Sequence, residues 1–188
     1  MITTTWIGRA MIHTVNRLIE AKVEERTAEK VRRCYQCKKC SAGCPVAFAM
    51  DLLPHEIMKM VQYGQEERLL KCSTIWLCAS CETCSTRCPN EIDIARVMDG
   101  LRGMSLEEGL VAEPEIAKFH RSFLNGIKLA GRTNESVLIG QYKALSRRLF
   151  DDLGLGAVMF IKGKVKVMPR VVKDRKSVRR IFKETEKG

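Results

Sequence analysis

Apolar residues recur at intervals of three and four through most of the chain, which is the spacing of an amphipathic helix. One such segment, 54–63, has Pro54 at a first helical position and is followed by Gly64, a frequent residue just past a helix end. A shorter helix is predicted at 66–71, and another starts after Asp93, whose carboxylate suits an N-cap. The helix at 54–63 has the apolar stripe Ile57, Met58 and Val61. The helix after Asp93 has the stripe Ile94, Val97, Met98 and Leu101.

The same spacing predicts helices toward both ends of the chain. Residues 1–33 are expected to form one helix that turns polar on most faces after residue 24. Two more are expected at 114–130 and 134–153, with apolar stripes inward and glycine after the last turn. The helix at 114–130 has the stripe Ile116, Phe119, Phe123 and Ile127 and is followed by Gly131. The helix at 134–153 has the stripe Leu138, Tyr142, Leu145 and Leu149 and is followed by Gly154 and Gly156. No segment alternates convincingly as a strand does, so an all-α fold is predicted.

Two copies of one cysteine pattern stand among these helices. The run C-x2-C-x2-C-x3-C-P occurs at 34–45 and again at 78–89. Bacterial two-cluster ferredoxins hold iron–sulfur cubanes through thiolates in this run. Three thiolates on one tight loop reach three irons of a cubane, but the loop cannot also reach the remaining corner. The fourth ligand therefore comes from the other motif, and the pattern predicts two 4Fe-4S clusters.

This crossing defines the expected ligands. Cluster 1 is assigned to Cys34, Cys37, Cys40 and Cys88, and cluster 2 to Cys78, Cys81, Cys84 and Cys44. Pro45 and Pro89 follow the crossing cysteines and turn the chain away from the clusters. The ninth cysteine, Cys72, is expected to be a buried apolar residue rather than a ligand.

Other uses of these cysteines fit the pattern less well. Structural zinc favours paired cysteines separated by a longer insert. A disulfide framework requires a secreted chain, whereas the N-terminus lacks the features of a secretory leader. The longest apolar run, 156–161, is far shorter than the roughly 18 residues of a membrane span. We therefore expect a reducing cytoplasm and no membrane span.

The formal net charge of +11 is concentrated near the C-terminus. Residues 156–188 hold eleven Lys or Arg against three acidic residues. Such a segment suits nucleic acid, an anionic membrane surface, an acidic protein partner or a solvated flexible end. With few aromatic residues and no nucleic-acid motif, docking on an acidic partner subunit is expected, with no nucleic acid bound.

Charged residues also distinguish the two cysteine motifs. Lys38 and Lys39 lie in the first, where Glu82 and Thr83 lie in the second. On charge grounds cluster 1 is expected to have the higher reduction potential, unless these side chains face solvent and shift it little. The three histidines, His13, His55 and His120, have no serine or carboxylate motif beside them, so no catalytic role is expected.

Four regions are expected along the chain. They are an amphipathic arm at 1–33, a two-cluster domain at 34–105, additional helices at 106–155, and a basic docking tail at 156–188. The arm either docks on a partner or packs on its own domain, because amphipathicity does not name the surface it covers. Helices after both cluster loops, in place of hairpins, resemble an α-helical ferredoxin, as at the C-terminal end of succinate dehydrogenase iron–sulfur subunits.

The motifs together resemble one family. C-x-Q-C-x-x-C-S-A-G-C-P-V, the following L-P-H-E-I-M-K-M-V-Q-Y-G, the second cysteine run and a downstream M-F-I-K-G-K-V-K-V-M-P-R are similar to the C subunit of heterodisulfide reductase from methanogenic archaea. The resemblance implies an electron-transferring member of an oxidoreductase complex. It implies a flavin-containing A subunit that donates electrons, and a catalytic B subunit that accepts them and reduces the mixed disulfide of coenzyme M and coenzyme B. A hydrogenase or formate dehydrogenase is expected in the larger assembly.

This chain differs from the catalytic B subunit in one respect, and two other functions also fit its motifs. The clusters of the B subunit are held by Cys-Cys-Gly motifs, whereas this chain has no adjacent cysteines, so disulfide chemistry is not assigned to it. The alternatives are an iron–sulfur subunit of a succinate or glycerol-3-phosphate dehydrogenase, and a nucleic-acid-binding module with structural clusters. Reversible bleaching by dithionite favours electron transfer, and salt-sensitive binding to DNA or RNA favours the module.

Overall fold

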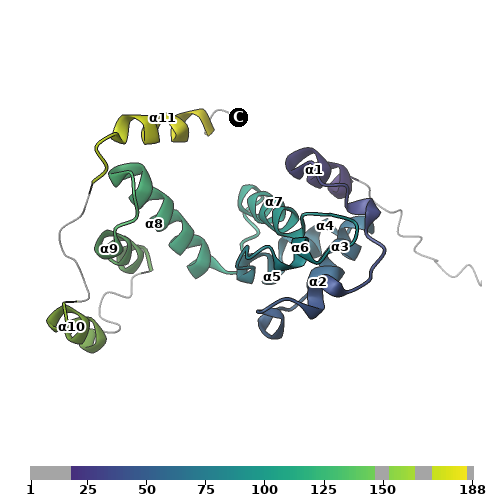
Figure 1. Ribbon diagram of the computed structural model, residues 1–188, viewed down its shortest axis with the longest axis horizontal. Helices are drawn as coiled ribbons and strands as arrows, with labels where there is room; N and C mark the ends of the chain where they lie inside the picture. Colours follow the sequence, from purple (N-terminus) through teal and green to yellow (C-terminus); the bar gives the residue numbers. More distant parts are fainter. Residues whose placement is uncertain (1–17, 147–152, 164–170, 186–188) are drawn as a thin grey trace, which may run out of the picture. The chain divides into compact units, whose positions relative to one another are not determined.

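The structure, a computed structural model, describes residues 18–146, 153–163 and 171–185. Within these ranges every regular element is a helix, which confirms the all-α prediction (Figure 1). The chain divides into two compact units, unit 1 up to Ala112 and unit 2 from Glu113 onward. Both cysteine motifs belong to unit 1.

Unit 1 is built around two helices, α3 and α7. Helix α7 packs on α1, α4, α5 and α6, and helix α3 packs on η1, α2 and α4. The apolar stripes predicted for α3 and α7 are buried. The elements are α1 (Leu18–Thr27), η1 (Val31–Arg33), α2 (Lys39–Ala42), η2 (Ala47–Ala49), α3 (Pro54–Gln62), α4 (Glu66–Leu70), α5 (Thr74–Leu77), α6 (Thr83–Thr86) and α7 (Ile94–Glu107).

Helix α1 and η1 lie in the described part of the arm expected at 1–33, and residues 1–17 lie outside the described ranges. Helix α1 packs on α3 and α7 (Figure 1), and its Ile19 and Val23 side chains are fully buried. The expectation of one helix through residue 33 was wrong, because α1 ends at Thr27. The Thr27 hydroxyl donates to the Val23 carbonyl (2.6 Å) and accepts from the Glu29 N–H (3.2 Å), which offers the backbone a partner outside the helix.

Close backbone packing and ion pairs hold α1 on unit 1. A Cβ added at Gly100 of α7 would lie 2.5 Å from Cγ2 of Thr27, so only glycine permits this approach. At the exposed edge Arg26 pairs with both carboxylate oxygens of Glu107, at 2.6 and 2.8 Å. Because exposed pairs contribute little, the buried apolar face supplies most of the stability of this contact.

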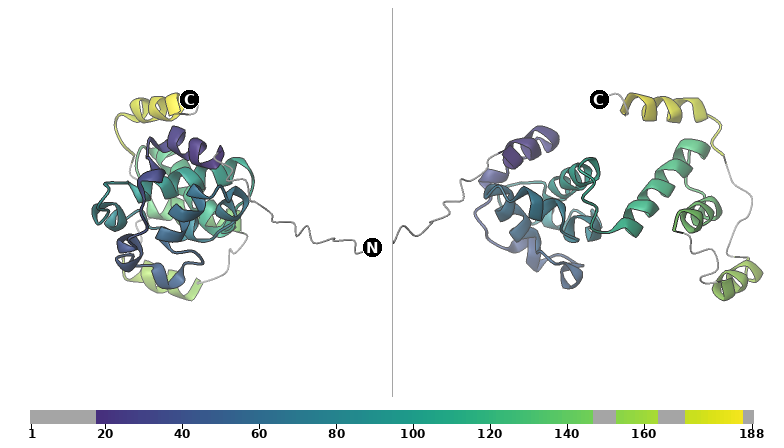
Figure 2. Two further views of the ribbon diagram at one scale, coloured as in Figure 1. Left: turned by 90° about the vertical axis from the view of Figure 1, so that its right-hand side faces the viewer. Right: turned by 180° about the vertical axis from the view of Figure 1, so that it is seen from behind.

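Unit 2 contains α8 (Pro114–Ala130), α9 (Glu135–Ser146), α10 (Leu153–Ile161) and α11 (Arg175–Thr185). Helices α9 and α11 both pack on α8 (Figure 2). Helix α8 has its predicted bounds, and Gly131 ends it at φ 78°. Its inward stripe differs from the prediction: Phe119 is 42% exposed although it meets Tyr142 edge-on at 5.9 Å, and the buried positions are Ser122, Gly126 and Ala130.

The end of unit 2 corrects one further expectation. Gly154 and Gly156 were expected to end a helix, but both lie inside α10. The surrounding Leu, Ala and Met residues favour helix, which offsets the cost of about 1 kcal/mol for each glycine. Part of the expected basic tail is helical as α11. Among the described residues, no helix combines the length and apolar character needed to cross a membrane.

Candidate metal centres

The two cysteine motifs share an unusual backbone conformation. Gln36 and Lys38 in the first motif have φ values of 63° and 64°, and Ser80 and Glu82 at the equivalent positions of the second have 49° and 58°. These left-handed residues curl each loop between its first three cysteines, although none of them is glycine. A short helix then follows in each motif, α2 with the third cysteine Cys40, and α6 with its counterpart Cys84. The sequence repeat is therefore also a structural repeat.

The eight motif cysteines line two separate pockets of unit 1. Cys34, Cys37, Cys40 and Cys88 line one, here called pocket 1, and Cys44, Cys78, Cys81 and Cys84 line the other, pocket 2. Each pocket combines the first three cysteines of one motif with the last cysteine of the other, and these groups coincide with the two expected ligand sets. Apolar side chains complete the walls: Ile92 and Ile94 in pocket 1, and Val46, Met50 and Met98 in pocket 2.

The exchange of the fourth cysteine occurs where α2 and α6 pack on each other. Gly43 lies against the side chain of Arg87, so closely that a Cβ on Gly43 would be 2.7 Å from Cδ of Arg87. Cys44 and Cys88 come directly after these two residues. The chain thus leaves each short helix at the junction, and each last cysteine lines the pocket of the other motif.

A side chain from a long helix holds the first cysteine of each motif. Gln62 of α3 donates through Nε2 to the carbonyls of Val31 (3.1 Å) and Cys34 (2.9 Å). Arg102 of α7 donates in the same way to the carbonyls of Ile75 (2.8 Å) and Cys78 (3.0 Å). In both cases the two carbonyls are three residues apart and the second belongs to the first cysteine. Neither anchor was predicted from the sequence. Aligning the segments after the two motifs by their cysteines and helix starts would have paired Gln62 with Arg102.

A serine anchors the third cysteine of each motif to the next long helix. Ser41, which follows Cys40, lies 2.7 Å from Nδ1 of His55 and accepts from the His55 backbone N–H at 3.1 Å. Ser85, which follows Cys84, donates to Oδ1 of Asp93 at 2.8 Å; it accepts from the Ala95 backbone N–H at 3.3 Å.

His55 also lines pocket 1. The serine that contacts His55 lies fourteen positions away in the chain, so no serine motif stands beside this histidine in the sequence.

Burial changes the pKa of several motif thiols. Burial raises the pKa of Cys40 and Cys78, and it raises the pKa of Cys84 to about 11. The exposed Cys81 has a lowered pKa, because the Thr83 hydroxyl, 3.4 Å away, stabilises its thiolate. The buried sulfurs are therefore protonated as free thiols at neutral pH, and they become thiolate ligands only when a metal displaces their protons.

Polar contacts outside the pockets fix the segment between the motifs. The Asp51 carboxylate accepts from the backbone N–H groups of Ser73 (3.0 Å) and Thr74 (2.9 Å) and from the Thr74 hydroxyl (2.6 Å). Burial alone would raise the pKa of Asp51, but these hydrogen bonds outweigh it and lower the pKa. The start of α5, which leads to Cys78, is thereby tied to the loop before α3.

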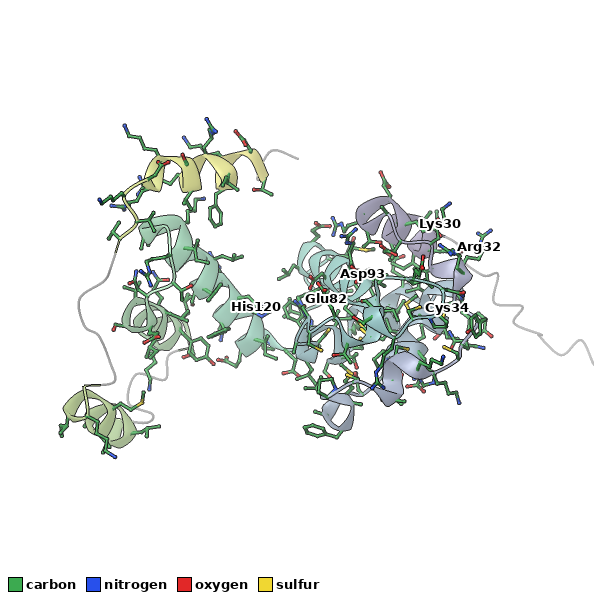
Figure 3. All side chains as sticks on the ribbon, in the orientation of Figure 1. Lys30, Arg32, Cys34, Glu82, Asp93 and His120 are labelled. Carbon is green, nitrogen blue, oxygen red and sulfur yellow. The ribbon has the colours of Figure 1, made fainter. Side chains whose placement is uncertain are left out.

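The residues of both pockets fit a metal–sulfide cofactor. Four soft thiolate donors in each pocket suit iron–sulfur chemistry, and apolar walls limit the access of water. A polar side chain lies 3.4 Å from one sulfur of each pocket: Gln36 Nε2 from Cys34 Sγ, and Thr83 Oγ1 from Cys81 Sγ. Figure 3 labels Cys34, Glu82 and Asp93 within unit 1.

Part of unit 1 is similar to a known protein family. Residues 30–92 match the family described as the 4Fe-4S dicluster domain. The matched residues include both cysteine motifs of unit 1.

The curated relatives belong to one group. The iron–sulfur C subunit of the CoB–CoM heterodisulfide reductase of Methanopyrus kandleri is 28% identical over 102 residues, 54% of this chain and 53% of the relative. The C subunit of the ferredoxin:CoB–CoM heterodisulfide reductase of Methanosarcina acetivorans is 36% identical over 95 residues, covering 50% and 38%. A protein of Archaeoglobus profundus, named for its likeness to the heterodisulfide reductase C subunit, is 27% identical over 113 residues, covering 58% and 60%.

These relatives confirm the resemblance to the heterodisulfide reductase C subunit that the cysteine motifs predicted. The chain spans about half the length of the curated relatives it matches. Outside the pockets, Cys72 is buried at 3% exposure, as expected for an apolar role, and burial raises its pKa.

Proposed function

We propose that this chain is the iron–sulfur electron-transfer subunit of a heterodisulfide reductase complex in methanogenesis. It would relay single electrons from a flavin-containing A subunit to the catalytic B subunit that reduces the heterodisulfide of coenzyme M and coenzyme B. The names of the relatives support the type of complex. The observation that carries the relay is the presence of two four-cysteine pockets in one small unit.

The ligands follow from the pockets. Cys34, Cys37, Cys40 and Cys88 would hold cluster 1, and Cys78, Cys81, Cys84 and Cys44 would hold cluster 2. When bound, each 4Fe-4S cluster supplies reversible one-electron chemistry. The chain's own part is to present thiolates, to exclude water with the apolar walls, and to keep the two centres adjacent by exchanging their fourth ligands. The substrate's disulfide would be reduced on the B subunit, because Cys-Cys pairs are absent from the printed sequence.

Unit 2 offers a surface for a partner subunit. Helix α11 places Val178 and Phe182 on its less exposed side, and Phe182 lies 5.9 Å from the ammonium of Lys128 on α8. Lys176, Arg179 and Arg180 of α11 are exposed. A row of exposed cations on an anchored helix suits an acidic surface, so we assign α11 to docking on an acidic face of a partner subunit.

The proposal is tested by purifying the tagged chain anaerobically from its native host. About eight iron and eight sulfide per chain are expected for two cubanes, with visible absorbance that dithionite bleaches reversibly. Two partners should co-purify, one that contains flavin and one that carries Cys-Cys-Gly motifs. A variant with Lys176, Arg179 and Arg180 changed to Glu should lose these partners and keep its iron. Zinc in place of iron, or clusters that dithionite cannot reduce together with salt-sensitive DNA binding, would overturn the proposal.

A further inference from the structure

The two serine anchors lie almost equally close to a motif sulfur. Ser41 Oγ is 3.9 Å from Cys40 Sγ, and Ser85 Oγ is 4.0 Å from Cys84 Sγ. A serine hydroxyl has one hydrogen to donate and can accept more than one hydrogen bond. Whether that hydrogen points at the sulfur therefore depends on the other partners of each serine, and these differ.

In the second motif Ser85 donates its hydroxyl hydrogen to Asp93. An ionised carboxylate accepts hydrogen bonds and donates none, so the 2.8 Å contact with Asp93 requires Ser85 to be the donor. Asp93 is held as an anion by the Arg96 backbone N–H at 3.0 Å and by the Arg96 guanidinium at 3.6 Å. No hydrogen of Ser85 is left for Cys84.

In the first motif both contacts of Ser41 can be donors. The His55 backbone N–H donates to Ser41 Oγ by necessity, and Nδ1 of the same residue, 2.7 Å away, donates whenever it carries a hydrogen. The hydrogen of Ser41 then has Cys40 Sγ as its acceptor. An anionic thiolate is the stronger acceptor when compared with a neutral ring nitrogen, and Cys40 is only 7% exposed, so water competes little.

We propose that Ser41, oriented by His55, donates a hydrogen bond to the sulfur of Cys40, that Ser85 makes no such bond to Cys84, and that cluster 1 therefore has the higher reduction potential. A hydrogen bond to a ligand sulfur stabilises the more negative, reduced state. His55 is thus a positioning residue. The inference rests on the proposed function and on its ligand sets.

The remaining polar groups around the pockets do not reverse this difference. Gln36 and Thr83 supply one side-chain contact at 3.4 Å to a sulfur of each pocket. The Arg102 guanidinium near Cys78 is paired with Asp99 at 2.9 Å, which offsets its charge. The charges of Lys38 and Glu82 also favour a higher reduction potential for cluster 1 than for cluster 2. Both side chains are exposed, however, and their charges are screened by solvent.

The test uses the same substitution at equivalent positions in the full chain loaded with both clusters. Iron and sulfide content is measured first, since a chain without two cubanes refutes the proposed function itself. In Ser41→Ala, the reduction equilibrium of cluster 1 should become about threefold less favourable, or about 28 mV at 59 mV per tenfold. Ser85→Ala is the matched control, and cluster 2 should move by less than half of this.

A third variant separates the hydrogen bond from simple packing. In His55→Asp the hydroxyl of Ser41 is retained, but it donates its hydrogen to the new carboxylate, as Ser85 donates to Asp93. The exchangeable-deuteron coupling of reduced cluster 1 in D2O, measured by ENDOR, should be lost in this variant as in Ser41→Ala. Equal shifts in Ser41→Ala and Ser85→Ala, an unchanged deuteron coupling in His55→Asp, or loss of cluster 1 from both first-motif variants would overturn the inference.

Discussion

The two halves of unit 1 have the same backbone plan and different charges. The first half, residues 31–62, and the second half, residues 75–102, each contain a left-handed cysteine loop, a short helix, a serine anchor and a long helix. Equivalent positions are occupied by different side chains: Lys38 and Glu82, Gly43 and Arg87, and Gln62 and Arg102. The two serines also have different side-chain partners, His55 and Asp93. Repetition of the backbone provides two similar thiolate sites. Under the proposed function, divergence of the side chains would give these two similar sites different reduction potentials.

The largest expected effect comes from removing a crossing cysteine. Cys88→Ser should deplete cluster 1, although Cys88 belongs to the second motif, and Cys44→Ser should deplete cluster 2. Iron content should fall toward half in each variant, and EPR of the reduced protein should show the loss of opposite signals. Cys72→Ser is the control and should keep both signals. If each variant instead lost the cluster of its own motif, the halves would be independent sites and the exchange would be wrong.

The anchors of the first cysteines should differ in strength between the halves. The Arg102 side chain is only 14% exposed and makes two hydrogen bonds to backbone carbonyls besides its ion pair. Arg102→Met should cost about 2–3 kcal/mol, whereas Gln62→Leu, which removes a neutral donor, should cost about 1 kcal/mol. The midpoint temperature of anaerobic cluster bleaching measures both. Lys71→Met, which removes an exposed i,i+4 ion pair with Glu67, should change it little.

The contact between Asp51 and the start of α5 has a defined pH dependence. Asp51→Asn should cost about 1–2 kcal/mol, because the charge that accepts from Ser73 and Thr74 is lost at a partly exposed site. A lowered folded-state pKa means that this stabilisation is complete above the unfolded-state pKa and is lost as pH falls through the folded-state value. The difference in bleaching midpoint between wild type and variant should therefore be the same at pH 6 and pH 8. A difference that shrank between those values would assign the effect to another group.

The sequence predicted the features that depend on a repeated pattern of residues. It did not predict the features that depend on a single side-chain contact. Helical spacing located α3, α7 and α8, because long amphipathic segments bury one face whatever their neighbours are. The cysteine run predicted the two groups of four that line the pockets. It did not predict the end of α1 at Thr27 or the left-handed Gln36 and Ser80, since these depend on one side-chain contact or on loop closure.

The anchors were missed for a related reason. His55 and Asp93 are inconspicuous in sequence, and their roles appear only when the fold places a serine beside each of them. The same holds for Gln62 and Arg102, which lie 28 and 24 positions from the cysteine carbonyls that they hold. Their pairing becomes visible only when the two halves are aligned on the duplicated unit.

The smallest expected effect tests whether surface charge contributes to the difference between the halves. Lys38→Glu should lower the potential of cluster 1, and Glu82→Lys should raise that of cluster 2, because a nearby positive charge stabilises the reduced state. Both side chains are exposed, so each shift should be smaller than that of Ser41→Ala and should decrease further as the salt concentration rises. Redox titrations at low and high ionic strength measure this directly. A salt-independent shift as large as that of Ser41→Ala would mean that charge, rather than the serine hydrogen bond, sets the order of the two potentials.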